Sequence, residues 1–216
     1  MHIPDGLISP QTYLPAYALA APLWFVAGRK LKLQLGEEAL PRLAVFTALA
    51  LLLSTLMLPL PGGTSGHALG VGLLALVFGP WIAFMAYSLV LLLQAVLIGA
   101  GGITALPVNA LAIGLVGAWV AFWTRSLLQG FGEAVAVIAA VWLAVMVAAL
   151  VLALVLGAQP TIAQAPDGTP RFFPFGPSIT VPAVLIPHAL IGAGEAALTL
   201  LIYRHARKRH WLAEPS

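Results

Sequence analysis

The first two residues and a histidine further along the chain carry the donor atoms from which this sequence could build a metal site. Met1 offers its α-amine, and His2 offers its backbone amide and the Nδ1 atom of its ring. Bound to one metal ion, these three nitrogens close two adjacent chelate rings with little strain. The amide must lose its proton to bind, which favours a metal that accepts a planar nitrogen field, Ni(II) or Cu(II), with Co(II) also conceivable.

A fourth nitrogen could come from His67, which follows the turn-forming residues 61–66, Pro-Gly-Gly-Thr-Ser-Gly. Histidine is the commonest metal ligand near neutral pH and binds as neutral imidazole. The alternative is that both histidines are incidental, one behind the initiator methionine and the other in a loop. Two arguments favour the metal site. Methionine is normally retained before a residue as large as histidine, and the topology below places residues 1 and 67 on the same side of a membrane.

The composition is that of an integral membrane protein. Hydrophobic residues make up 61% of the chain and charged residues 8%, and the mean hydropathy is +1.02. Long, separate apolar runs predict α-helical spans rather than a β-barrel. The net charge of +3 comes from basic residues in short loops and does not indicate nucleic acid. Cysteine is absent, which excludes a thiolate site, and no signal peptide is evident, so Met1 is expected to be the mature N-terminus.

One membrane domain, residues 1–216, is predicted as an all-α bundle of about seven transmembrane helices. The expected spans are residues 13–27, 43–60, 68–78, 81–98, 108–123, 133–157 and 182–203. The third is too short to cross a hydrocarbon layer of about 30 Å alone, so it is either a short helix buried among others or half of a re-entrant hairpin. A crossing gives the better charge pattern and is the expectation. The other segments are a chelating N-terminus (1–10), a ligand loop (61–67), an external loop (158–181) and a basic cytoplasmic tail (204–216).

The distribution of basic residues predicts the orientation of this bundle. With seven spans, nine of the ten Lys and Arg residues fall on the side of the C-terminus, and Arg171 is the exception. The positive-inside rule then places the C-terminus in the cytoplasm and the N-terminus outside. Met1, the loop of His67 and the loop of residues 99–107 would share the outer side, from which a nutrient metal arrives.

Polar residues within the spans are candidates for function because they are costly at membrane depth. His188 and Glu195 lie on one face of the last span and are interpreted either as a proton-linked pair or support for the metal ligands, or as a structural hydrogen-bonded contact. Asn109, Gln94 and Ser88 admit the same two interpretations. Of the three, Asn109 is the best placed to orient a metal ligand, because it follows the outer glycine loop. Neither a nucleotide-binding motif nor a catalytic grouping is present in the sequence.

Four motifs together resemble the NikM/CbiM family, the substrate-capture (S) components of energy-coupling-factor (ECF) importers for nickel and cobalt. They are Met-His-Ile-Pro-Asp-Gly at 1–6, Pro-Gly-Gly-Thr-Ser-Gly-His-Ala-Leu-Gly at 61–70, Gly-Gly-Ile-Thr-Ala-Leu at 101–106, and His188 followed by Gly-x-Gly-Glu at 192–195. The resemblance implies Met1, His2 and His67 as nitrogen ligands. It implies a transporter subunit of an ABC-type importer in the prokaryotic cytoplasmic membrane, not an enzyme.

The same resemblance implies partners and a metal. The partners are a transmembrane coupling (T) subunit, two cytoplasmic ATPase subunits and, in many systems, a small accessory membrane subunit, here expected as a separate chain. We expect the coupling subunit to dock on the inward-facing surface, including residues 29–42 and the small-residue edge of the first span, Ala16, Ala20 and Ala27. The opening motif resembles that of the nickel branch of the family, and the absence of cysteine also favours this branch. Ni(II) is therefore the expected substrate, and Co(II), for cobalamin supply, is the second choice.

Two functions of other classes remain as alternatives. A membrane metallohydrolase would use Glu195 as the base, and it needs an open coordination position beside a substrate cavity. A passive channel or structural subunit would leave the histidines incidental. Loss of metal binding on acetylation of the amine would exclude this last alternative.

Overall fold

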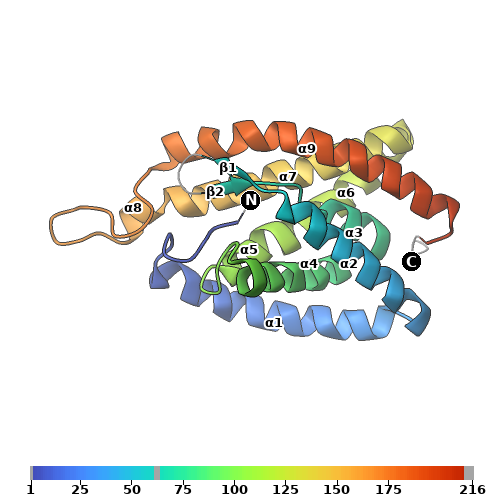
Figure 1. The fold of residues 1–216 in the computed structure, drawn as a ribbon, viewed down its shortest axis with the longest axis horizontal. Helices are drawn as coiled ribbons and strands as arrows, with labels where there is room; N and C mark the ends of the chain where they lie inside the picture. Colours follow the sequence, from blue (N-terminus) through green and yellow to red (C-terminus); the bar gives the residue numbers. More distant parts are fainter. Residues whose placement is uncertain (1, 61–63, 212–216) are drawn as a thin grey trace.

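The computed structural model describes residues 2–60 and 64–211. Three parts of the sequence interpretation therefore lie outside the described residues: Met1 among the proposed ligands, residues 61–63 of the ligand loop, and residues 212–216 of the basic tail. Long helices run side by side through the molecule (Figure 1), which confirms the predicted all-α membrane bundle.

Seven helical segments follow one another in the described part of the chain, as predicted. They are α1 (Pro10–Gln34), α2 (Leu40–Thr55) after a 3-10 turn, α3 (Val71–Phe78), α4 (Pro80–Leu93) continued by the π-helical turn η2 (Gln94–Ile98), α5 (Leu106–Asn109) continued through the π-helical η3 (Ala110–Gly117) into α6 (Ala118–Leu128), α7 (Glu133–Gly157) with the short α8 (Gln159–Ile162), and α9 (Pro177–Lys208). Five of these segments are long and apolar enough to cross a membrane. α1 has 25 residues but is less apolar than these five.

The third segment differs from the expected crossing helix. α3 has eight residues, about 12 Å of helix, and all but one of them are buried. It is therefore the short helix buried among others, because it cannot cross a layer of about 30 Å by itself. Glycines with left-handed backbone angles bound it, Gly70 (φ 78°) before and Gly79 (φ 85°) after. A Cβ on Gly70 would also lie 2.8 Å from the Cβ of Ala50.

A small β-hairpin occupies the region expected to be a turn. β1 (Leu58–Leu60) pairs antiparallel with β2 (Thr64–Gly66), with Leu58 opposite Gly66. The second span consequently ends at Thr55 rather than residue 60, since the residues around Pro59 cannot continue the helix. The external loop is also shorter than predicted, because α8 extends from the end of α7 and α9 begins at Pro177, several residues before the predicted span.

Small residues let the helices approach closely. On α7, alanines at every fourth position are buried, at 136, 140, 144 and 148, and α9 packs beside this helix. A Cβ on Gly192 of α9 would lie 3.2 Å from Val145 of α7. On α1, Ala20 and Ala27 are fully buried. These two residues therefore cannot belong to the expected docking edge, because they face the inside of this chain, and docking at Ala16 and residues 29–42 stays a prediction.

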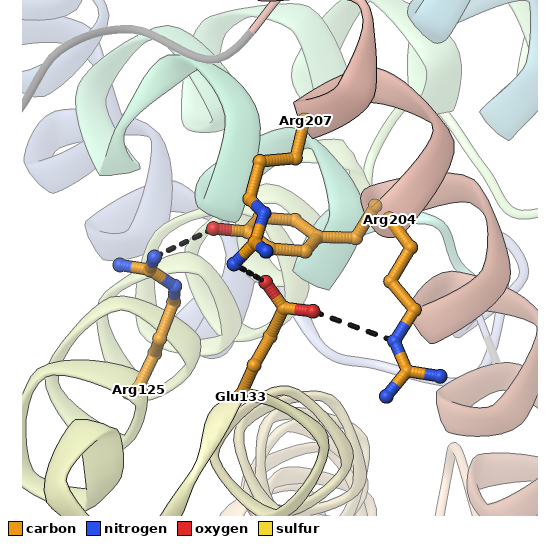
Figure 2. A network of polar contacts seen from close by, with 5 residues as sticks. Arg125, Glu133, Arg204 and Arg207 are labelled. Carbon is orange, nitrogen blue, oxygen red and sulfur yellow. Dashed lines mark hydrogen bonds and ion pairs between the residues drawn. The ribbon is translucent and has the colours of Figure 1, made fainter.

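The basic residues gather at one end of the bundle, where the α1–α2 connection, the α6–α7 connection and the end of α9 meet (Figure 1). Figure 2 shows the network that ties three helices together there. Glu133 at the start of α7 accepts hydrogen bonds from Arg204 and Arg207 of α9, and Arg125 of α6 donates to the Tyr203 hydroxyl. The positive-inside rule assigns this end to the cytoplasm.

Candidate metal centre

The N-terminal segment runs from the start of α1 into the middle of the bundle (Figure 1). His2, Ile3 and Ile8 are buried, with 4%, 1% and 1% of their surfaces exposed. The backbone of Ile3 is held by Asn109 at both of its polar atoms. Its N–H donates to Asn109 Oδ1 (2.9 Å), and Asn109 Nδ2 donates to its carbonyl (3.0 Å). Asn109 therefore positions the residue next to His2, as the sequence suggested.

A second clamp holds the segment three residues beyond His2. The Asp5 carboxylate accepts hydrogen bonds from the backbone N–H groups of Ile103 (3.0 Å) and Thr104 (2.8 Å), and from the Thr104 hydroxyl. Burial alone would raise the pKa of Asp5, but these hydrogen bonds hold it below its ordinary value. The contact needs glycine at 102, because a Cβ there would lie 2.1 Å from Asp5 Oδ1.

His67 lies beside His2, as the topology predicted. Its Nε2 atom is 3.3 Å from His2 Nδ1, and the two ring centroids are 4.3 Å apart. His67 Nδ1 is 2.9 Å from the carbonyl of Ala68, which can only accept, so Nδ1 carries the proton and Nε2 keeps its lone pair toward His2. Two nitrogens bound at right angles to one metal are about 2.8 Å apart, and two bound opposite each other are about 4 Å apart. The observed spacing is nearer to that of adjacent ligands.

Glu195 fixes the chain that follows His67. Its two carboxylate oxygens accept hydrogen bonds from the N–H groups of Leu69 and Gly70, at 2.7 Å each. These N–H groups precede α3, so the carboxylate also lies at the positive end of that helix. Glu195 is 3% exposed and thus satisfies two buried donors that would otherwise lack partners. Glu195 thus makes a structural hydrogen-bonded contact between α9 and the chain that follows His67, and its support of a metal ligand stays a prediction.

Both candidate ligand side chains are in the form that binds metal. Burial is the largest cause that lowers the pKa of His2 well below its ordinary value, and the same holds for His67. Each ring is therefore neutral well below pH 7. Near neutral pH a metal ion therefore does not have to displace the second proton of an imidazolium ring.

His188 is buried on α9, with 1% of its surface exposed. Its Nδ1 donates to the Val184 carbonyl (2.7 Å), and its Nε2 has no hydrogen-bond partner within the part of the chain that the structure describes. Among those residues, no three His, Asp or Glu side chains form a group that could hold a metal ion. His188 therefore does not join His2 and His67 as a third side-chain ligand, and its proton-linked role stays a prediction.

A cavity of about 260 Å³ reaches the candidate site. It is lined by His2 and Pro4 of the N-terminal segment, by Met57 after α2, and by residues 98–101 after α4. Residues 99–101 belong to the loop that sequence analysis placed on the same side as the N-terminus. The cavity thus lies next to His2, between the N-terminal segment and this loop.

The contacts of two further residues were not predicted from the sequence. Asp5 was named only within the motif of residues 1–6, and Gln94 was named as a polar residue within a span without a specific partner. A fully buried glutamine in an apolar run is a signal in itself, since it must find hydrogen-bond partners at membrane depth. The signal for Asp5 was weaker, because its partners lie about a hundred residues away in sequence.

Comparisons with known proteins identify the protein family in which this site occurs. The profile of a family described as cobalt uptake substrate-specific transmembrane region (CbiM) matches residues 2–212. A probable fused nickel transport protein LarMN from Lactiplantibacillus plantarum is 40% identical over 212 residues, covering 96% of this chain and 65% of the relative. A fused nickel transport protein NikMN from Rhodobacter capsulatus is 38% identical, covering 92% and 59%. The chain therefore spans less than two thirds of these two relatives. A crystal structure of a truncated transition metal transporter superposes with a TM-score of 0.93 at 32% identity, covering 97% of this chain and 99% of that one.

Proposed function

Because the chain belongs to the family of cobalt uptake substrate-specific transmembrane regions (CbiM), we propose that it is the metal-capturing subunit of an importer and that its substrate is Ni(II). It is a multi-pass membrane protein and a metal uptake component of the CbiM/NikM type. In the proposed site, the Met1 amine, the His2 amide and ring, and the His67 ring supply four nitrogens to the ion.

One observation carries this proposal: His67 Nε2 and His2 Nδ1 face each other at 3.3 Å inside the bundle, as buried, neutral rings. Two imidazoles alone hold a metal weakly. The backbone next to His2 offers the further donors, since the amide and the terminal amine form chelate rings with the same histidine. A planar set of four nitrogens is the field that Ni(II) accepts.

The choice of nickel before cobalt rests on two further points. The two relatives described above are named as nickel transport proteins, whereas the family description and other relatives name cobalt. The sequence has no cysteine, and its opening and loop motifs resemble the nickel branch. Co(II) is the second candidate for the same site.

The proposal includes partners, because uptake against a gradient needs an energy source. The sequence contains no nucleotide-binding motif, so ATP hydrolysis falls to other subunits. We assign this chain as the S component of an ECF importer that works with a transmembrane coupling subunit, two cytoplasmic ATPases and, in some systems, a small accessory membrane subunit. The metallohydrolase alternative is disfavoured by geometry, because both oxygens of Glu195 are already bonded to backbone N–H groups.

The test is metal binding and uptake by the purified chain. We expect one Ni(II) per chain with the yellow colour and diamagnetism of a square-planar nitrogen complex. In liposomes, concentrative nickel uptake should require the partner subunits and internal ATP. Concentrative uptake by the chain alone would refute the capture role, and occupancy by Co(II) alone would overturn the ranking of the metals.

A further inference from the structure

Gln94 is a buried side chain whose amide orientation is dictated by its neighbours. It is fully buried at the start of the π-helical turn η2. Its Nε2 donates to Ser54 Oγ (2.8 Å) and lies 3.4 Å from the Ser54 carbonyl. Ser54 Oγ donates its own proton to the Leu51 carbonyl (2.9 Å), so both Ser54 atoms accept from Gln94. A flipped amide would set two acceptors against each other, and Oε1 must therefore point away from Ser54.

The unpaired oxygen of Gln94 and the unpaired nitrogen of His2 are complementary in their hydrogen-bonding capacity. Gln94 Oε1 and His2 Nε2 are both buried without a hydrogen-bond partner in the described part of the chain. Burial is the largest influence on the pKa of His2 and lowers it. The Gln94 side chain lies close enough to act as a hydrogen-bond acceptor for His2 and partly opposes that lowering. A buried acceptor thus lies near a ring nitrogen that can carry a proton.

The tautomer of His2 explains why this pair is open in the structure. His67 Nε2 has a lone pair, because its Nδ1 proton is committed to the Ala68 carbonyl. The contact of 3.3 Å between His67 Nε2 and His2 Nδ1 is favourable when Nδ1 of His2 holds the ring proton. His2 Nε2 then has a lone pair, which cannot bond to the lone pairs of Gln94 Oε1. The two atoms stay unpaired for that reason.

We propose that Gln94 is a positioning residue for the captured metal, whose Oε1 accepts a hydrogen bond from Nε2–H of His2 once Nδ1 binds the ion. This inference rests on the proposed function. A metal at Nδ1 takes the lone pair of that atom, so the single proton of the neutral ring must sit on Nε2. Ser54 holds Gln94 in the orientation that receives this proton. The ring thereby gains a partner that fixes its plane and raises its basicity, as outer hydrogen bonds do for metal-bound histidines.

The position of Gln94 agrees with this role. A π-helical turn shifts the residues that follow it around the helix axis, and such turns are frequent at functional sites. Here the turn spans Gln94 to Ile98, and Ile98 together with the following residues 99–101 lines the cavity beside His2. The helix that holds the acceptor is therefore continuous with the loop that borders this cavity.

The test compares Gln94→Met with Gln159→Met, which removes a second fully buried glutamine, one bonded to the Ser9 backbone at the start of α1. Ni(II) affinity is measured by chelator competition, and the ring protons of ¹⁵N-labelled histidine are observed by NMR in the diamagnetic Ni(II) complex. In the wild type, Nε2–H of His2 should appear as a slowly exchanging proton upon Ni(II) addition. Q94M should bind Ni(II) about 10–100-fold more weakly and lose that protected proton. Q159M should retain both.

Gln94→Glu separates positioning from packing, because a buried, protonated carboxyl donates to Ser54 through its O–H and keeps its carbonyl oxygen toward His2. We expect Q94E to recover the protected Nε2–H signal. Full affinity and a protected Nε2–H in Q94M would overturn the inference while leaving the proposed function intact. A wild-type chain that binds no Ni(II), or binds it without changing the His2 ring, would overturn the proposed function and this inference with it.

Discussion

His67 Nε2 lies 3.3 Å from His2 Nδ1, although 65 residues separate the two histidines in sequence. Independent contacts hold each partner of this pair. Asn109 and Asp5 fix the N-terminal segment, and Glu195 fixes the chain after His67. The pair is therefore set by the packing of the whole bundle, and substitutions at either ligand or at its supports should change metal binding in distinguishable ways.

Removal of the imidazole at position 67 should weaken binding more than removal of any supporting residue. His67→Ala leaves the three proposed donors of Met1 and His2, so we expect Ni(II) affinity to fall by more than about 100-fold without vanishing. His188→Ala is the matched control, because it removes another buried histidine whose Nδ1 is bonded within its own helix. Equal and small effects of the two substitutions, measured by titration, would show that His67 is not a ligand.

The dependence of affinity on pH should reflect the amine and the amide rather than the imidazoles. Burial lowers the pKa of both His2 and His67, so neither ring has a proton to release near neutral pH. Below the reference amine pKa of about 7.7–8.0, binding then releases about two protons, and log affinity should rise by about two per pH unit between pH 6.5 and 7.5. A slope near four in this range would contradict neutral imidazoles.

The same two histidines predict how the metal-free protein responds to acid. Their folded-state pKa values lie below the unfolded value of about 6.5, so the unfolded chain binds more protons below that pH. Stability is therefore complete above about pH 6.5 and should be lost as the pH falls toward the folded-state values. Thermal unfolding in detergent between pH 7.5 and 5 measures this trend. His2→Gln combined with His67→Gln should flatten it, and an unchanged slope in that double variant would exclude these histidines as its cause.

Glu195 should act on metal binding through the chain after His67. Glu195→Gln replaces one acceptor oxygen with a donor, so one of the N–H groups of Leu69 and Gly70 loses its partner. A buried unpaired N–H costs about 1–3 kcal/mol, and we expect both lower stability and weaker Ni(II) binding. Glu133→Gln, at the basic end of the bundle, is the control and should leave affinity unchanged. Equal Ni(II) affinities for the two variants would remove Glu195 from the support of the site.

Gly102 tests the clamp on the N-terminal segment without touching a ligand. In Gly102→Ala the new Cβ would lie 2.1 Å from Asp5 Oδ1, so Asp5 must move and take the segment with it. We expect at least about a 10-fold loss of Ni(II) affinity. Gly28→Ala adds the same methyl group within α1, where it meets nothing within 4 Å, and should bind normally. Normal binding by G102A would show that the position of Asp5 does not matter to the site.

The sequence predicted the bundle well because apolar length and loop charge are local signals. The sixth predicted span coincides with α7, and the basic residues meet at one end as the orientation required. The prediction was wrong at the β-hairpin, where Pro59 and the glycines interrupt the helical pattern. It was also wrong at α3, which is buried among other helices although it is too short to cross a membrane. Hydropathy does not predict which elements a short segment packs against.

The proximity of the two candidate histidines was predictable, and the contacts that hold them in place were less so. His2 and His67 followed from donor chemistry and from topology, and the structure brings them together. Asn109 and Glu195 were recognised as polar residues at membrane depth, but their partners are backbone groups that no side-chain motif reveals. The orientation of Gln94 depends on Ser54 of another helix, which sequence spacing does not relate to it.

The most direct measurement is Ni(II) affinity of the chain with a free Met1 amine against the same chain with that amine acetylated. Acetylation removes one nitrogen donor outright, whereas His2, His67, Asn109 and Glu195 remain as they are. We predict that high-affinity binding and the yellow square-planar spectrum are lost while thermal stability of the metal-free protein is unchanged. Full affinity and an unchanged spectrum in the acetylated chain would contradict the chelate formed by Met1 and His2.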